Sequence, residues 1–192
     1  ETEELVLWML DTTKGIESGR FIDFGTGSGC IPISFKAQRP GWQVAGIDLS
    51  TAALDVAARN AASCSAEIDF LQADMLQPVS VSGVYAEGID VIVSNPPYIP
   101  LGRKETLNVS VTGFEPSLAL FTPDDDPLLY YRSLEAIASD ILKHDGWLFL
   151  EVHEEFAAAT FDLFDKPGYA EQELRNDLSG NPRMIRVRRV RS

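Results

Sequence analysis

The chain has 192 residues, of which 45% are hydrophobic, and this length suits a single domain, residues 1–192, with one buried core. It carries 16 lysines and arginines against 29 aspartates and glutamates, so the formal net charge is −13 and we expect no direct binding to nucleic acids or anionic membranes. Two distant cysteines without metal-ligand spacing, the lack of a membrane-length apolar run and an acidic start favour a cytoplasmic protein with no metal site.

Short apolar runs alternate with helical stretches along the chain, which is typical of a parallel sheet covered by helices on both faces. The first five runs are mostly apolar, as buried parallel strands are, whereas the last two alternate in polarity and predict an antiparallel edge. The predicted strands cover residues 20–24, 43–47, 67–72, 90–94, 147–152, 169–175 and 184–190. The predicted fold is α/β: a Rossmann-like, doubly wound, seven-stranded, mostly parallel sheet with an antiparallel edge strand.

Five helices are predicted between these strands, and Ser50 is a good N-cap for the third of them. They cover residues 1–11, 29–38, 50–62, 126–144 and 154–164. The connection from residue 95 to residue 125 has neither a helical nor a strand period. A connection of this length inside one domain is usually functional or disordered.

The stretch DFGTGSG ends the first predicted strand and opens a helix. Glycines permit a sharp turn and a close backbone approach to a ligand, and the helix N-terminus offers free N–H groups. The spacing is one residue short of the dinucleotide pattern. It resembles the first motif of class I S-adenosylmethionine-dependent methyltransferases, in which Asp23 would lie near the cofactor's amino group. The predicted cofactor contacts in this motif are Asp23, Gly25, Thr26, Gly27, Ser28 and Gly29.

Two further acids follow the next two strands. Asp48 ends the second strand, 19 positions after Gly29, where an acid accepts hydrogen bonds from ribose hydroxyls in nucleotide-type sites. Asp74 ends the third strand, and in this methyltransferase class that acid, or the next residue, Met75, meets the adenine amino group. Because the ends of parallel strands share one edge, these residues predict one cofactor pocket.

The motif Asn95-Pro96-Pro97-Tyr98 follows the fourth strand. Each proline disfavours the helical region for the residue before it, so the chain is extended and stiff there. The Asn95 side-chain oxygen and the Pro96 carbonyl can together accept both hydrogens of a planar –NH₂ group, while Tyr98 adds an aromatic face. We therefore predict that Asn95, Pro96 and Tyr98 are catalytic, that the whole motif binds substrate, and that Asn95 also touches the cofactor.

Such a motif resembles those of methyltransferases that act on nitrogens conjugated to a ring or a carbonyl. Two substrate classes fit it: the exocyclic amines of adenine or guanine in RNA or DNA, and the side-chain amide of a protein glutamine. A noncatalytic cofactor-binding or adaptor domain is a third reading. The net charge of −13 disfavours the nucleic-acid reading, and the intact Asn95 motif disfavours the noncatalytic one.

Several segments, in order along the chain, resemble the catalytic domain of the release-factor glutamine methyltransferase family: ETEELV, NPPYIP, GFEPSLAL, DPLLYYRSL and GNPRMIRVR. The resemblance implies transfer of a methyl group from S-adenosylmethionine, leaving S-adenosylhomocysteine, to the glutamine of the Gly-Gly-Gln loop of peptide chain release factors. It places Phe114 and Glu115 in the groove for the substrate peptide. It also implies that the family's N-terminal helical domain is absent from this chain. We expect a monomer.

Two other features have simpler interpretations. His144 and His153 flank the fifth predicted strand and are expected to be surface or cap residues, because no serine or cysteine nucleophile accompanies them. The last strand, 184–190, alternates arginines with apolar residues and is expected to be an exposed edge that its charges protect from pairing.

Overall fold

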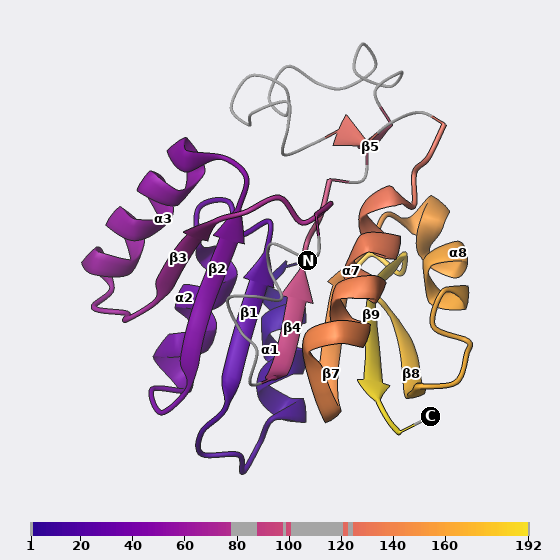
Figure 1. Ribbon diagram of the computed structural model, residues 1–192, viewed down its shortest axis with the longest axis horizontal. Coiled ribbons are helices and arrows are strands. Elements are labelled where there is room, and N and C mark those ends of the chain that lie inside the picture. Colours follow the sequence, from indigo (N-terminus) through magenta and orange to yellow (C-terminus); the bar gives the residue numbers. More distant parts are fainter. Residues whose placement is uncertain (1, 78–87, 98, 101–120, 123–124, 192) are drawn as a thin grey trace.

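The computed structural model describes residues 2–77, 88–97, 99–100, 121–122 and 125–191. Within these residues, seven strands form one sheet in the order β3-β2-β1-β4-β7-β9-β8 (Figure 1). Their bounds are β1 Arg20–Phe24, β2 Gln43–Asp48, β3 Asp69–Gln72, β4 Ile89–Ser94, β7 Leu142–Glu151, β8 Tyr169–Asn176 and β9 Pro182–Arg189. The predicted seven-stranded, mostly parallel sheet is therefore confirmed, with β8 and β9 as an antiparallel pair at its edge.

The sheet has a switch point between β1 and β4. From β1 the chain moves outward to β2 and β3, then returns to the other side of β1 to form β4, which is parallel to β1. The loops that follow β1 and β4 therefore leave the sheet at the same edge but diverge, and ligands bind in the crevice that such a divergence leaves. Above this edge, β5 Ile99–Pro100 pairs with β6 Phe121–Thr122 in a two-residue parallel ladder.

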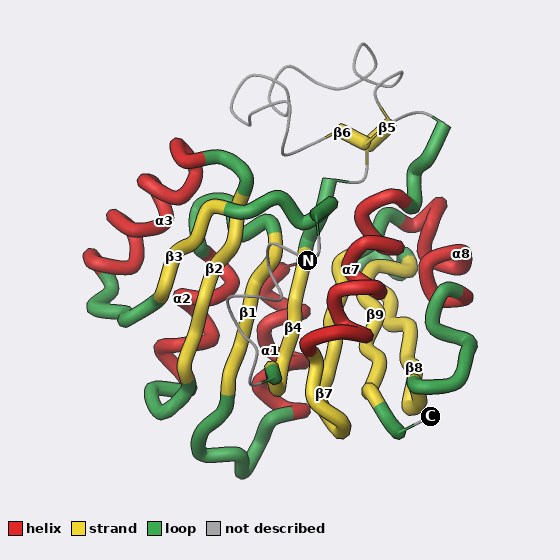
Figure 2. The backbone as a smooth tube through the Cα atoms, viewed as in Figure 1, coloured by secondary structure: helices red, strands yellow, loops and turns green. Residues whose placement is uncertain are grey.

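Helices cover both faces of the sheet because its strands are apolar on both sides (Figure 2). On β1, Phe21 faces the core that α1 and α2 complete, whereas Ile22 and Phe24 face the core that α7 completes. The bounds are α1 Thr2–Thr12, α2 Cys30–Gln38, α3 Thr51–Ser63, α7 Leu129–Ile141, η2 Glu154–Phe156 and α8 Ala157–Asp162. These two cores hold the strand ends, and hence the loops beyond them, in register.

Local predictions for the helices are confirmed at α3 and corrected at α7. Ser50 caps α3, and its hydroxyl accepts a hydrogen bond from the Ala53 amide at 3.2 Å. The helix predicted over 126–144 begins at Leu129 and ends at Ile141, because Leu142 pairs with Ile89 and opens β7. Sheet pairing thus overrides helix propensity in the last turn of that helix.

The prediction that 184–190 forms an exposed edge is wrong. The last strand, β9, lies between β7 and β8 and is antiparallel to both, so β8 is the edge strand. Its apolar residues Met184, Ile185 and Val187 are buried, and they supply both cores. An interior strand pairs with a neighbour on each side. Whether the last strand of the chain lies inside the sheet or at its edge depends on this long-range pairing, which the local sequence pattern does not reveal.

Candidate active site at the carboxyl edge

The glycine turn after β1 folds back onto β2. The amides of Gly25 and Thr26 both donate to the Ile47 carbonyl, at 2.8 and 2.9 Å. Gly25 has φ of +73°, and a Cβ atom there would lie 3.2 Å from the Met75 methyl group, so this position requires glycine. Gly27 also has positive φ, but a Cβ there would meet nothing within 4 Å. The turn is therefore tight on its inner side and open on its outer side, as a ligand cradle must be.

Helix α2 begins directly after this turn. Its N-cap residue, Gly29, is in the left-handed conformation and supplies no side-chain cap, so the first amides of α2 gain no acceptor from it. The carbonyl of Ser28 accepts a hydrogen bond from the Asn60 side chain at 2.9 Å, which joins the turn to α3. The turn thus presents a positive helix end and open space at one place.

Asp23 lies beneath the turn with a fully buried side chain. Neither carboxylate oxygen has a hydrogen-bond partner among the described residues. Burial raises the pKa of Asp23 to about 8; the Thr26 hydroxyl opposes this rise without reaching ordinary hydrogen-bond geometry, and the charge of Asp48 adds to it. A buried, unpartnered carboxyl is costly unless a ligand completes it, and a cation such as an ammonium group is the natural complement.

Asp48 braces the glycine turn from the end of β2. One of its carboxylate oxygens accepts from the Gly27 amide and the other from the Ser50 amide, both at 2.9 Å. Sequence reasoning assigned Asp48 to the ligand alone and missed this bracing role. The two roles are compatible, because each carboxylate oxygen has a second lone pair that a ligand hydroxyl can use.

The segment after β3 lies against α7. Asp74 accepts a hydrogen bond from the Leu76 amide at 2.9 Å, and the Met75 carbonyl accepts one from the Ser133 hydroxyl. Burial raises the pKa of Tyr130 in the first turn of α7, and the charge of Asp74 adds to the rise, so this phenol is near the acid. Sequence reasoning missed both α7 residues, since only the fold brings them to β3.

Leu49 is a third residue that the prediction omitted. It follows Asp48 at the carboxyl end of β2, and half of its side chain is exposed. An apolar residue directly after a strand-end acid would suit a flat ligand base, which needs an apolar surface beside the polar groups that hold its sugar.

The segment after β4 is held on the other side of the switch point. The Ser94 hydroxyl donates to the Phe24 carbonyl at 2.6 Å, tying the ends of β4 and β1 together. Pro96 and Pro97 are buried and Asn95 is half-buried. The backbone oxygen of Asn95 lies 3.9 Å from the Cβ position of Gly25, so the two motifs adjoin. The predicted site residues Tyr98, Phe114 and Glu115 lie outside the described residues.

These strand ends bring together a glycine turn, three acids and an Asn-Pro-Pro segment across the switch point. The strand order and the site together define the class I methyltransferase fold. A family model described as "Methyltransferase small domain" matches residues 2–117, which is more than half of the chain. The chain belongs to this methyltransferase small domain family.

Curated relatives support the same placement. A release factor glutamine methyltransferase of Flavobacterium psychrophilum is 37% identical over 190 residues, covering 97% of this chain and 65% of the relative. One from Enterococcus faecalis is 38% identical over 186 residues, covering 96% of this chain and 64% of the relative. The chain spans about two thirds of the length of these relatives.

Solved structures share the fold at low sequence identity. SMU.1697c of Streptococcus mutans, assigned to the methyltransferases and solved in complex with S-adenosylhomocysteine, is 14% identical with a TM-score of 0.60; the match covers 90% of this chain and 89% of that one. In the described part of the chain, no helix is long and apolar enough to cross a membrane, and no group of three or more metal-ligating residues occurs.

Proposed function

We propose that the protein transfers a methyl group from S-adenosylmethionine to the side-chain amide nitrogen of a glutamine in the Gly-Gly-Gln loop of a peptide chain release factor. The observation that carries this proposal is the placement of the Asn95 backbone beside Gly25, across the switch point. This placement supports an amide acceptor site next to a cofactor cradle. The family of the chain and the names of its relatives support the same reaction. The proposed site of action is the cytoplasm, where translation terminates.

The residues present fit S-adenosylmethionine, which when bound supplies an electrophilic methyl group on a sulfonium. Asp23, which is buried and has no hydrogen-bond partner in the described part of the chain, would hold the amino group of the methionine part. Asp48 would accept from the ribose hydroxyls, and Asp74 would accept from the adenine amino group. The open outer side of the turn at Gly27 leaves room for the cofactor to lie against the turn. Each contact uses a polar group that is only partly used, or not used, within the chain itself.

Asn95 and Pro96 would orient the substrate. An amide –NH₂ is planar and its lone pair is delocalised, so its hydrogens must be held by acceptors if the nitrogen is to face the methyl group. The Asn95 side-chain oxygen and the Pro96 carbonyl can provide two such acceptors on a segment whose prolines have little entropy to lose. Burial of Pro96 and Pro97 helps to exclude water from the same place. The amide proton leaves to water after the transfer.

A labelling experiment tests the proposal. The protein is incubated with methyl-labelled S-adenosylmethionine and one of three acceptors: a release factor, the same release factor with its Gly-Gly-Gln glutamine changed to alanine, or bulk RNA and DNA. We expect label only in the unmodified release factor. Label in RNA or DNA alone would establish the exocyclic-amine reaction in its place, and equal label in both release factors would place the acceptor outside the glutamine.

A further inference from the structure

The turn between β8 and β9 lies at the same edge of the sheet as Asn95. Strand β8 runs parallel to β7, since both are antiparallel to β9, so its carboxyl end reaches the carboxyl edge. The register makes this explicit: Ser94 pairs with Leu150, the next residue, Glu151, pairs with Met184, and Met184 pairs with Arg175. Residues 177–181 therefore leave the sheet about three strand spacings, or roughly 14 Å, from the end of β4.

This turn is rigid. The carboxylate of Asp177 accepts hydrogen bonds from the amides of Ser179 and Asn181, at 2.9 and 3.0 Å. It also pairs with the Arg183 guanidinium at 3.2 Å, and both side chains are buried. The Asn181 amide, above all, keeps the pKa of Asp177 below its ordinary value, and the Arg183 and Ser179 contacts act in the same direction. The conformation of the turn is thus determined by several independent bonds.

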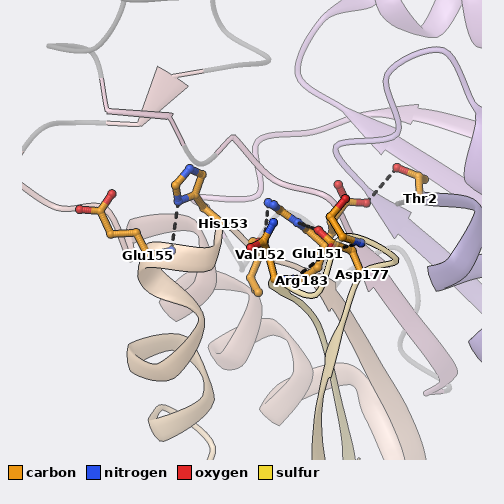
Figure 3. Close-up of polar contacts among 9 residues, drawn as sticks. Thr2, Glu151, Val152, His153, Glu155, Asp177 and Arg183 are labelled. Carbon is orange, nitrogen blue, oxygen red and sulfur yellow. Dashed lines mark hydrogen bonds and ion pairs between the residues drawn. The ribbon is translucent and has the colours of Figure 1, made fainter.

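The turn is also attached to the strand next to the active-site strand. Arg183 donates through Nη1 to the Val152 carbonyl at 3.3 Å, and the Val152 amide donates to the Arg183 carbonyl at 2.8 Å (Figure 3). The neighbouring residue, Glu151, is buried and accepts a hydrogen bond from the Thr2 hydroxyl at 2.8 Å, which joins the start of α1 to the same edge. The turn therefore moves with the frame that positions Asn95.

Leu178 lies on this turn and is 93% exposed. The next most exposed large apolar residue in the described part of the chain, Leu7, is only 65% exposed. Leu178 contributes almost nothing to the core, and turn positions are usually occupied by polar residues or glycine. An apolar side chain on a preorganised support loses little entropy when a partner covers it, and this favours binding at that place.

We propose that Leu178 and its turn form a docking point for the protein that carries the acceptor glutamine, and that an apolar surface of that protein covers Leu178 while its loop enters the Asn95 site. This inference rests on the proposed function. The spacing sets a size requirement: a substrate must extend roughly 14 Å from the reacting amide to reach the turn. A pentapeptide with the glutamine at its centre extends at most about 7 Å to either side and cannot reach it.

Steady-state methylation of a full release factor and of such a pentapeptide tests the docking point. Leu178→Ser should raise KM for the release factor by roughly tenfold, with kcat unchanged, because burial of one leucine is lost. It should leave the pentapeptide kinetics and the affinity for S-adenosylhomocysteine unchanged. Leu178→Met, which keeps an apolar side chain, should retain the parent KM.

Ile16→Ser is the matched control, because Ile16 is an exposed apolar loop residue that precedes β1 at the opposite edge of the sheet. It should change neither substrate's kinetics. A parent-like KM in Leu178→Ser, or an equal loss with the pentapeptide, would overturn the docking point while leaving the proposed function in place. A parent protein that methylates neither the release factor nor the pentapeptide would overturn both.

Discussion

The two halves of the carboxyl edge use their polar groups in opposite ways. At the ends of β1 and β4, Asp23 is buried without a hydrogen-bond partner among the described residues, and the turn at Gly27 faces open space. At the ends of β7 and β8, Asp177 and Arg183 are also buried, but each is bonded to the other and to the backbone. Burial is similar in the two halves, whereas satisfaction of the polar groups differs.

We interpret this difference as one between a proposed ligand site and the framework that supports it. A buried carboxyl without a partner costs free energy, and the protein reduces that cost by holding Asp23 protonated, with a pKa of about 8. Such a group persists at a place where a ligand completes it. In the other half, Asp177 and Arg183 satisfy each other and hold the strand ends rigidly. Substitutions in the first half should therefore affect binding or turnover without unfolding the protein.

The largest effect is expected at Asn95. Asn95→Ala removes one of the two acceptors that orient the amide and should lower methyl transfer roughly 10²- to 10³-fold, by analogy with the loss of one preorganised polar contact. Asn95→Asp should also be strongly impaired, because it adds a charge to a pocket that already holds three acids. The measurement pairs a methylation assay with calorimetric binding of S-adenosylhomocysteine, which should change little in Asn95→Ala.

Circular dichroism confirms that each Asn95 variant is folded. A folded Asn95→Ala variant that methylates a release factor within a few-fold of the parent would show that the Asn-Pro-Pro segment is only a stiff turn.

A smaller effect is expected at Asp48. Asp48→Ala should weaken the binding of S-adenosylmethionine and S-adenosylhomocysteine by about 1.5–3 kcal/mol, roughly 10- to 150-fold. The ribose hydroxyls and the Gly27 amide both lose a charged acceptor. Asp48→Asn keeps a side-chain acceptor and should lose less. Isothermal titration calorimetry measures both variants against the parent. Parent-like affinity in Asp48→Ala would show that the end of β2 does not contact the cofactor.

We expect the stability of the protein to depend on pH through Asp23. Its folded pKa of about 8 lies above the ordinary value of 3.8, so the folded chain keeps a proton that the unfolded chain has lost between these values. The free energy of unfolding without ligand should therefore fall as pH rises from about 4 to about 8 and then level off. Asp23→Asn should lack this particular decline. Urea denaturation at several pH values measures it, and equal slopes in parent and variant would contradict the assignment.

The same carboxyl predicts proton release on cofactor binding. At pH 7 Asp23 is mostly protonated, and an ammonium group bound beside it favours the carboxylate, so binding of S-adenosylhomocysteine should release up to one proton. Calorimetry in buffers with different ionisation enthalpies reports this number. The release should be lost in Asp23→Asn.

No effect is expected from nucleic acid. The net charge is −13, and three arginines of β9 are engaged in ion pairs: Arg183 with Asp177, Arg186 with Glu173 and Arg188 with Glu171. Because the chain is acidic and these arginines are paired, it should not retain duplex DNA or structured RNA at near-physiological salt. A gel shift that weakens steeply with added salt would contradict this expectation and would favour the exocyclic-amine substrates.

The sequence predicted much of the first half of the edge. All seven strands were expected, although β7 begins five residues before its predicted start. The first five were recognised as continuous apolar runs and the last two by their alternation in polarity. Ser50 was expected to cap α3 because a serine before a helical run can accept a backbone hydrogen bond. The residues that end β1, β2, β3 and β4 were assigned to one pocket because parallel strands end at one edge. These are local or topological signals.

The features that the sequence did not predict depend on long-range contacts. The place of β9 between β7 and β8 follows from strand pairing. The alternation of Ile185 and Val187 is the same in an edge strand and in an interior strand, so it could not predict this place. Ser133 meets Met75 across 58 positions, and Arg183 meets Val152 across 31. The roles proposed for Tyr98, Phe114 and Glu115 remain predictions, since they lie outside the described residues.

The central claim is that the carboxyl edge of β1 and β4 methylates a glutamine side chain. The most direct measurement is tandem mass spectrometry of a release factor treated with the protein and S-adenosylmethionine, with fragments that separate the Gly-Gly-Gln glutamine from its neighbours. We expect the added mass of one methyl substitution on that glutamine in the parent reaction and its near absence with Asn95→Ala. Methylation at any other residue, or an unmodified glutamine beside methylated nucleic acid, would contradict it.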